Sequence, residues 1–195
     1  MVSAERATGS RFSAVHRSAA QHRVLDAALK LIAERGVGGT SLQMIADEVG
    51  VTKAAVYHQF RTKEEIVIAL TERELGRLDD ALDAAEAEES RPRAREMLLT
   101  RVIDMAVERR QAAATLQFDP VIVRLLAEHE PFQQFLTRLY GVLLGDADDE
   151  ARVPAAMLSG AIGTAVMHPL VADVDDDTLR SQLLLLTRRL LALPE

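Results

Sequence analysis

The chain has 195 residues, 48% of them hydrophobic, and no cysteine, which excludes disulfides and thiol chemistry in a chain long enough for one or two globular domains. The net charge is −7, yet residues 1–65 carry nine Lys/Arg and seven Asp/Glu, whereas residues 66–195 carry fourteen and twenty-three. This asymmetry is typical of a nucleic-acid-binding module joined to an acidic second domain, and the lack of a long apolar run or a secretory leader predicts a cytoplasmic protein.

The first 18 residues are small and polar, carry Arg6, Arg11 and Arg17, and show no helical period. We expect residues 1–18 to form a flexible N-terminal tail. The alternative is a basic arm that reaches into a DNA minor groove. A helix with a regular apolar face is then predicted from Ala19 to Arg35, and Gly36 ends it.

The stretch from Thr40 to Phe60 predicts two helices joined by a tight turn. Apolar residues fall at helical spacing in the first of them, at Leu42, Ile45, Ala46 and Val49. Thr40 followed three residues later by Gln43 predicts a capping box, and Gly50 suits the left-handed backbone of the turn. Thr52 then caps a short second helix, in which Val56 should point inward with Phe60 behind it. This is a helix-turn-helix, whose second helix should enter a DNA major groove.

The outward residues of the second helix suit contacts with DNA. Thr52 and Lys53 lie at its N-terminus, where donors meet phosphates and lysine can reach a guanine edge. Ala54 and Ala55 are small enough for close approach to the bases, and their methyl groups can meet a thymine methyl. Tyr57 and His58 can donate hydrogen bonds to phosphates, and Lys63 can hold the same strand. Each of these residues could instead be a plain surface or capping residue.

A second capping box, from Thr62 to Glu65, opens a fourth helix that the apolar spacing continues to about Ala87. We therefore predict a helix-turn-helix domain over residues 19–66 and a helical second domain over residues 67–195. The second domain should contain further helices, which prolines and charged loops delimit at 93–110, 120–128 and 131–144, with one starting at Pro154 and a leucine-rich one at the C-terminal end. The predicted fold class is all-α.

The last two helices carry the pattern of a homodimer interface. One has a stripe of small residues and the other a leucine seam spaced four and three residues apart. A single helix-turn-helix reads too few base pairs for selectivity, which also favours a dimer over a buried helix in a monomer. The predicted interface residues are Ala156, Gly160, Gly163, Leu179, Leu183, Leu186 and Leu190.

Residues Arg23 to Leu70 resemble the DNA-binding domain of the TetR (tetracycline-repressor) family of bacterial transcription regulators. The likeness rests on RVLDAALKLIAERG, TSLQMIADEVGVTKAAVYHQF and RTKEEIVIAL, and beyond about residue 75 it is one of architecture only. The resemblance implies a four-helix dimer interface and a ligand pocket inside the second domain. It also implies DNA contacts at Thr40, Thr52, Lys53, Tyr57, His58 and Lys63.

The pocket candidates are the adaptable or aromatic residues of the second domain, although each could be ordinary core packing. Few charges are expected in this interior, so an apolar small molecule is the predicted ligand. The candidates are Met97, Met105, Phe118, Phe132, Phe135, Tyr140, Met157 and His168.

No catalytic, cofactor or metal site is predicted. The five histidines lack metal-binding spacing, and no nucleophile motif or phosphate-binding glycine loop occurs. The acidic runs 146–150 and 173–177 lack the ligand positions of an EF-hand and suit solvated loops. The sequence thus predicts a ligand-responsive regulator, most simply a repressor that binds a palindromic DNA operator as a homodimer. A helical protein-interaction module and, less favoured, a helical-bundle enzyme are the alternatives.

Overall fold

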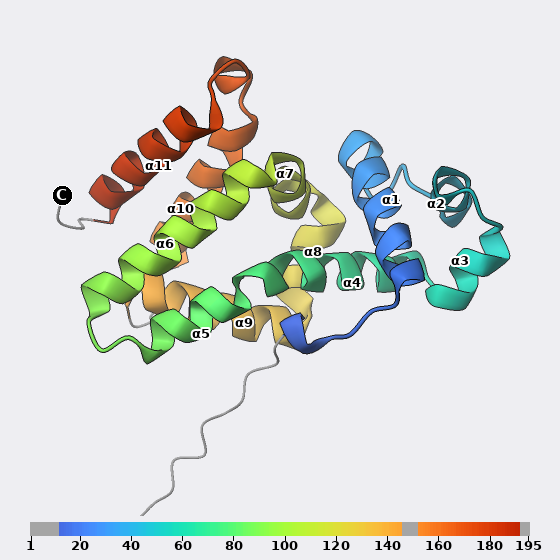
Figure 1. Cartoon of the computed structure of the whole chain (residues 1–195), viewed down its shortest axis with the longest axis horizontal. Coiled ribbons are helices and arrows are strands. Elements are labelled where there is room, and N and C mark those ends of the chain that lie inside the picture. The colour runs from blue at the N-terminus through green and yellow to red at the C-terminus, as the bar shows by residue number, and fades with distance from the viewer. Residues whose placement is uncertain (1–11, 146–151, 192–195) are drawn as a thin grey trace, which may run out of the picture.

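The computed structural model describes residues 12–145 and 152–191, and within these ranges every regular element is a helix (Figure 1). The all-α prediction is therefore confirmed. The first three α-helices form a compact unit at one end of the molecule, and the later helices form a larger bundle at the other end. The acidic run 146–150 lies outside the described residues.

The N-terminal unit contains α1 (Ala19–Arg35), α2 (Leu42–Val49) and α3 (Lys53–Gln59). The side-chain hydroxyl of Ser18 caps α1 and Gln21 returns a bond to the Ser18 backbone, which makes a complete capping box. Gly50 ends α2 in the left-handed conformation, with φ 77°, which glycine adopts without strain.

Two of the predicted capping details are wrong. Ser41, and not Thr40, caps α2, because its hydroxyl accepts a hydrogen bond from the backbone N–H of Met44 at 3.2 Å. Thr62 does cap the next helix through the N–H of Glu65, but the Glu65 carboxylate accepts from the N–H of Arg61 instead of completing the box.

The long fourth helix of the prediction is divided in two. It consists of α4 (Lys63–Leu75), the 3₁₀ turn η2 (Gly76–Leu78) and α5 (Asp79–Ala87). Gly76 has low helix propensity, and the backbone of residues 12–13 packs directly against it, so the helix bends at this point.

The helix predicted for residues 93–110 is present, and a further helix follows it directly. The first is α6 (Arg91–Glu108), and after a non-helical backbone at Arg109 the chain continues as α7 (Arg110–Phe118), which was not predicted. The remaining elements are α8 (Pro120–Glu128), α9 (Glu130–Leu144), α10 (Arg152–Met167), the 3₁₀ turn η4 (Pro169–Val171) and α11 (Asp176–Leu190).

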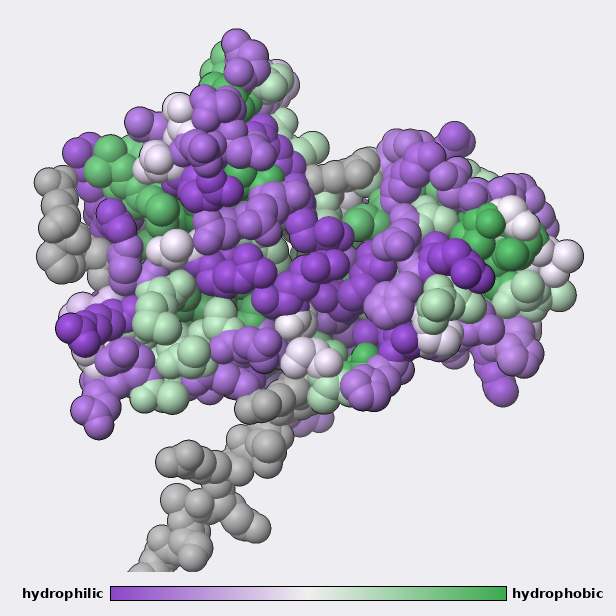
Figure 2. All heavy atoms as spheres, viewed as in Figure 1, coloured by the Kyte–Doolittle hydropathy of each residue, from purple (hydrophilic) through white to green (hydrophobic). Residues whose placement is uncertain are grey.

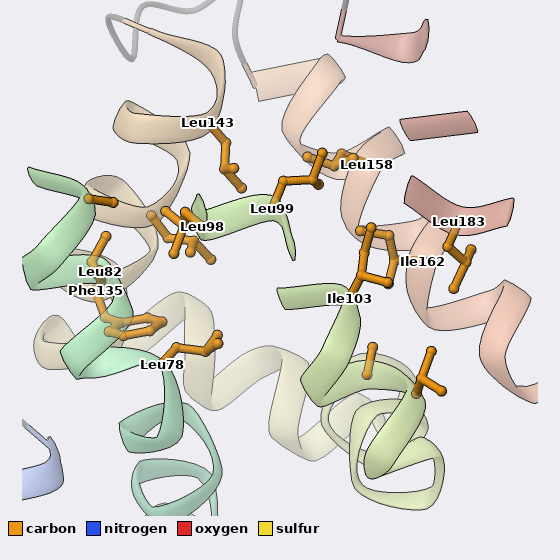
Figure 3. Packing of buried hydrophobic residues seen from close by; sticks show 14 of the residues in the cluster. Leu78, Leu82, Leu98, Leu99, Ile103, Phe135, Leu143, Leu158, Ile162 and Leu183 are labelled. Carbon is orange, nitrogen blue, oxygen red and sulfur yellow. The ribbon is translucent and has the colours of Figure 1, made fainter. Parts of the chain in front are cut away.

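Buried apolar side chains form two cores. The N-terminal core joins α1 to α4 and also receives Ile122 of α8; it includes Val24, Leu25, Ala28, Leu31, Ile32, Ile45, Ala46, Val56, Phe60, Ile66, Val67, Leu70 and Ile122. The C-terminal core fills the bundle (Figure 3); it includes Phe12, Leu78, Leu82, Leu98, Leu99, Ile103, Phe132, Phe135, Leu139, Leu143, Leu158, Ile162, Val166, Leu179 and Leu183. The predicted domain boundary at residue 66 falls inside α4, whose residues up to Leu70 belong to the N-terminal core. The helix α4 is therefore shared by both units.

Residues 12–18 do not form the flexible tail that the sequence predicted. Phe12 begins the 3₁₀ turn η1 (Phe12–Ala14) and is buried in the C-terminal core, 3% exposed. Arg17 forms an ion pair with Glu72 at 2.5 Å, so this arginine is directed at α4 and not at the recognition helix. Arg6 and Arg11 lie outside the described residues.

Candidate nucleic-acid interface

The turn between α2 and α3 holds the two helices in a fixed relation. The N–H of Val51 donates to the carbonyl of Ala46 at 2.9 Å, and the hydroxyl of Thr52 accepts from the N–H of Ala55 at 3.2 Å. On the inner side of α3, Val56 is fully buried and Phe60 is 6% exposed, so both point into the N-terminal core as predicted. The opposite side of α3 therefore faces outward.

The predicted contact residues on α3 all lie on this outward side. Tyr57 is 55% exposed and, in the part of the chain that the structure describes, neither its hydroxyl nor the Lys53 ammonium has a hydrogen-bond partner. A phenol and an ammonium with unused donors suit phosphate oxygens or base edges. The exposed residues are Thr52, Lys53, Ala54, Ala55, Tyr57 and His58.

Thr40 is different, and its assignment as a DNA contact is corrected. It is 2% exposed, and its hydroxyl donates to the carbonyl of Gly36 at 2.9 Å. A buried hydroxyl whose proton is already donated supports the loop between α1 and α2, and it cannot offer that proton to a phosphate.

Lys63 supports the same loop while remaining near the outward side. Its ammonium donates to the carbonyls of Val37 at 2.8 Å and Thr40 at 3.1 Å. An ammonium has three donors, so one remains for a phosphate. The side chain thus joins the start of α4 to the loop between α1 and α2.

Around α3 the cations differ in how far they are neutralised. Lys30 of α1 forms an ion pair with Glu48 at 2.6 Å, and this hydrogen bond raises the pKa of the Lys30 ammonium. Lys53 and Arg61 form no ion pair with another described residue. Lys53 on α3 and Arg61 in the link that follows it therefore keep an unneutralised positive charge.

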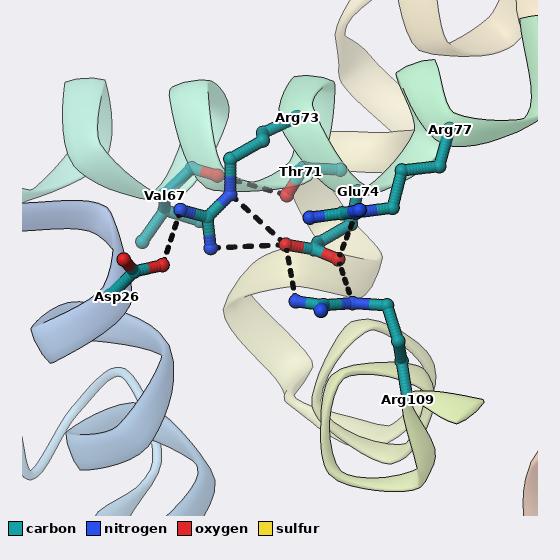
Figure 4. A network of polar contacts seen from close by, with 7 residues as sticks. All are labelled: Asp26, Val67, Thr71, Arg73, Glu74, Arg77 and Arg109. Carbon is teal, nitrogen blue, oxygen red and sulfur yellow. Dashed lines mark hydrogen bonds and ion pairs between the residues drawn. The ribbon is translucent and has the colours of Figure 1, made fainter. Parts of the chain in front are cut away.

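A buried cluster of ion pairs connects this unit to the bundle, and the sequence did not indicate it (Figure 4). The Glu74 carboxylate, on a residue 1% exposed, accepts hydrogen bonds from Arg73 at 3.0 Å, Arg77 at 3.1 Å and Arg109 at 2.6 and 3.1 Å. Arg73 also reaches Asp26 of α1 at 2.7 Å. One carboxylate thus connects α1, α4 and the junction of α6 with α7.

The predicted interface residues on α10 and α11 divide into two groups. Ala156, Leu186 and Leu190 are exposed, and an added Cβ at Gly160 would meet no atom within 4 Å, so these residues face outward. In contrast, Gly163, Leu179 and Leu183 are buried within the subunit, which corrects the prediction of one continuous seam. Inward residues of α11 follow the i+4 row from Leu179 through Leu183 to Thr187, so the buried face rotates and leaves Leu186 and Leu190 outside.

Further large apolar side chains lie exposed on the same two helices. Val153 is 66% and Met157 57% exposed on α10, while Leu186 is 57% and Leu190 49% exposed on α11. Hydrophobic side chains gather at the end of the molecule where α11 runs, far from α3 (Figure 2). We call the exposed residues Val153, Ala156, Met157, Leu186 and Leu190, together with the partly exposed Gly160, the α10–α11 face.

In the described part of the chain, the eight pocket candidates differ in burial and no described hollow is lined by more than one of them. Met97, Phe118, Met157 and His168 are exposed, so none of the four is part of the buried interior. Phe132 and Phe135 are buried in the C-terminal core against Phe12, with ring centroids 5.4 and 5.6 Å from the Phe12 ring. Met105 and Tyr140 are partly buried; Met105 packs against this core, and burial raises the pKa of the Tyr140 hydroxyl.

The described residues of the bundle region line several hollows, of which two are the widest there. One of about 490 Å³ lies between α5, α6 and α9 and is lined by Arg91, Arg95, Arg138 and three glutamates among others. The other, about 440 Å³, lies where α1 meets α7 and α8, and Phe118 is one of its walls. Among the described residues, no cluster of metal-ligating side chains occurs and no helix is long and apolar enough to cross a bilayer.

Comparison with known proteins agrees with this geometry. Residues 24–70 match the family described as "Bacterial regulatory proteins, tetR family". The HTH-type transcriptional regulator BetI of Rhizobium meliloti is 37% identical over 79 residues, which are 40% of this chain and 39% of BetI. The sequence match therefore spans well under half of that relative.

Likeness in fold extends over almost the whole chain. A TetR-like transcriptional regulator from Rhodococcus sp. RHA1 has a TM-score of 0.67 at 22% identity, covering 91% of this chain and 98% of the other. The transcriptional regulator FadR from Bacillus subtilis, in complex with stearoyl-CoA, has a TM-score of 0.65 at 20% identity, covering 89% and 99%. Residues 24–70 thus match the TetR family's DNA-binding region, and the fold of the chain as a whole is similar to that of a solved TetR-like regulator.

Proposed function

We propose that the protein is a ligand-responsive DNA-binding transcription regulator. The observation that carries this proposal is α3, whose outward side presents unused donors of Lys53 and Tyr57 beside two exposed alanines, while Val56 anchors its inner side. Small residues allow the helix backbone to approach the bases closely, and the flanking donors suit phosphates. The cytoplasm is the proposed location.

The α10–α11 face is the proposed homodimer interface. Its exposed valine, methionine and leucines form an apolar surface on two adjacent helices, and Gly160 has room for close approach of a partner helix. Two copies joined at this end would carry two recognition helices to successive turns of one face of DNA, which suits a palindromic operator. Repression by blocking transcription is the simplest outcome of such binding.

The proposed effector is a small apolar molecule or one with an acyl chain. The related fold of FadR from Bacillus subtilis was solved with stearoyl-CoA, which supports an effector of this class. An effector changes operator affinity only through its different affinity for the two conformations, so its site must move when the recognition helices move. Thermal unfolding in the presence of stearoyl-CoA tests the class, since a specific ligand raises the melting temperature.

Fluorescence anisotropy with labelled DNA from upstream of the protein's own gene, at two salt concentrations, tests the DNA-binding function. We expect selective binding that weakens with salt, because lysine–phosphate contacts release counterions. The double variant Lys53→Ala/Tyr57→Ala should lose operator binding and keep its helical circular dichroism. Arg93→Ala removes a positive charge from an exposed site on α6 and should bind like the wild type. Retained binding by the double variant would refute the contact assignment.

A further inference from the structure

Residues 12–18 connect the two units along a path separate from α4. They run from the C-terminal core, beside α5 and α9, to the start of α1 (Figure 1). This segment, which we call the strap, is held at both of its ends and in its middle, as the following contacts show.

The first end is held by an aromatic contact in the bundle. The Phe12 ring lies 5.4 Å from the ring of Phe132 and 5.6 Å from that of Phe135, in tilted arrangements that favour aromatic attraction. Gly76 lies directly under the strap, because a Cβ built there would be 3.0 Å from the Ser13 nitrogen and 3.1 Å from Phe12 atoms. A Cβ at position 76 would therefore require the strap to shift by a few tenths of an ångström, and a β-branched side chain there would crowd it further.

Polar contacts hold the middle of the strap. The backbone N–H of Ser13 donates to Oδ2 of Asp79 at 2.7 Å, and Asp79 is fully buried. The other oxygen, Oδ1, has no hydrogen-bond partner in the described part of the chain. Among the described residues, the strap therefore supplies the hydrogen-bond donor for the buried Asp79 carboxylate. Arg17, with a side chain only 6% exposed, binds Glu72 of α4 at 2.5 Å.

The second end of the strap is part of the DNA-binding unit. Ser18 caps α1 through the N–H of Gln21 at 3.2 Å, and Gln21 accepts from the Ser18 N–H at 2.9 Å. The Ser18 hydroxyl also makes a long contact of 3.5 Å with the amide oxygen of Gln59, the last residue of α3. The strap thus runs from the bundle core to the start of α1 and to the end of α3, the helix that presents the proposed DNA-binding surface.

We propose that the strap fixes the orientation of the DNA-binding unit relative to the bundle. A short segment held at both ends allows little rotation of one unit against the other. When the strap is released, the angle between α4 and α5 at the Gly76 bend should vary more widely. Because a fixed orientation lowers the entropy cost of binding, release of the strap should weaken operator binding roughly threefold to tenfold. This last consequence rests on the proposed DNA-binding function, whereas the orientation itself does not.

The orientation can be measured by spin-label distances in the full-length protein. The chain has no cysteine, so Asp47→Cys on α2 and Arg93→Cys on α6, both exposed, introduce the sole labelling sites. Labelled protein is diluted with unlabelled protein so that only distances within one chain are recorded. Phe12→Ala releases the strap by removing its aromatic contacts in the bundle core. Gly76→Val instead crowds the strap from α4's end and leaves the Phe12 side chain intact. Val15→Ala, at a strap residue 45% exposed, is the matched control.

We expect a broader or shifted distance distribution in Phe12→Ala and Gly76→Val and the wild-type distribution in Val15→Ala. A wild-type distribution in folded Phe12→Ala or Gly76→Val would overturn the proposal. If Phe12→Ala unfolds, Gly76→Val decides alone, because it removes no core side chain. Operator binding is measured in parallel without labels. If neither the wild type nor any variant binds DNA, the proposed function is refuted. The proposal that the strap fixes the orientation is then still decided by the spin-label distances.

Discussion

Replacing Glu74 by glutamine should destabilise the fold strongly, because its carboxylate is the common acceptor for three arginines. Glutamine keeps the shape but loses the charge, so Arg73, Arg77 and Arg109 would face one another without an anion between them. Removing one partner of a buried ion pair costs about 3–5 kcal/mol. Arg73 has a side chain only 9% exposed and cannot regain its water.

The magnitude follows from the exposure of the other two arginines. Arg109 is 30% and Arg77 40% exposed, so both can turn partly to solvent when the carboxylate is lost. We therefore expect Glu74→Gln to cost about 3 kcal/mol, at the lower end of the range for buried pairs. Arg77→Gln removes one contact of a half-exposed side chain and should cost less than about 1 kcal/mol.

Urea unfolding followed by circular dichroism at two salt concentrations measures both variants. The decrease in the free energy of unfolding caused by Glu74→Gln should change little with salt, because salt screens buried charges weakly. A loss below about 1 kcal/mol, or one that disappears at high salt, would show that the cluster acts as an ordinary surface ion pair and would refute the argument.

Three further predictions concern single residues. Thr62→Ala removes the cap of α4 and should lower the free energy of unfolding by about 1 kcal/mol in the same urea titration; an unchanged midpoint would contradict the capping role. Burial raises the pKa of the Tyr140 hydroxyl, so the folded state favours its neutral form. The stability that this neutral form contributes is complete below the pKa of the unfolded chain, about 10, and is lost as the pH rises through the higher pKa of the folded state. Tyr140→Phe should therefore show a shallower loss of stability above about pH 10, and equal slopes would count against this. Leu186→Asp should weaken the proposed dimer tenfold or more in sedimentation equilibrium, whereas Val123→Asp, on the similarly exposed side of α8, should leave it intact.

The α10–α11 face shows what the spacing of apolar residues predicts about a helix and what it does not. The leucine spacing correctly indicated an apolar helix, but it placed Leu179 and Leu183 on the same surface as Leu186 and Leu190. The structure packs the first pair on α6 and leaves the second pair exposed. A seam with alternating spacings of four and three residues assumes one straight contact line along the helix, whereas the buried residues of α11 are spaced by four and their row turns around the helix.

The burial of two pocket candidates has a related reason. Side-chain type identified Phe132 and Phe135 as adaptable apolar groups, but the residue that covers them, Phe12, lies 120 residues earlier in the chain. Nothing local to α9 indicates that an N-terminal aromatic ring fills the space beside it.

The sequence by itself determined the helix-turn-helix, the outward residues of α3 and most of the other helices, although not α7 or the division between α4 and α5. These depend on interactions within a few residues: apolar spacing, the Thr52 and Thr62 caps, and the turn at Gly50. Only the tertiary structure decided the break at Arg109, the bend at Gly76 and the strap, because each depends on a partner distant in the chain. Arg109 leaves the helical backbone where it binds Glu74, 35 residues away, and no local propensity encodes that contact.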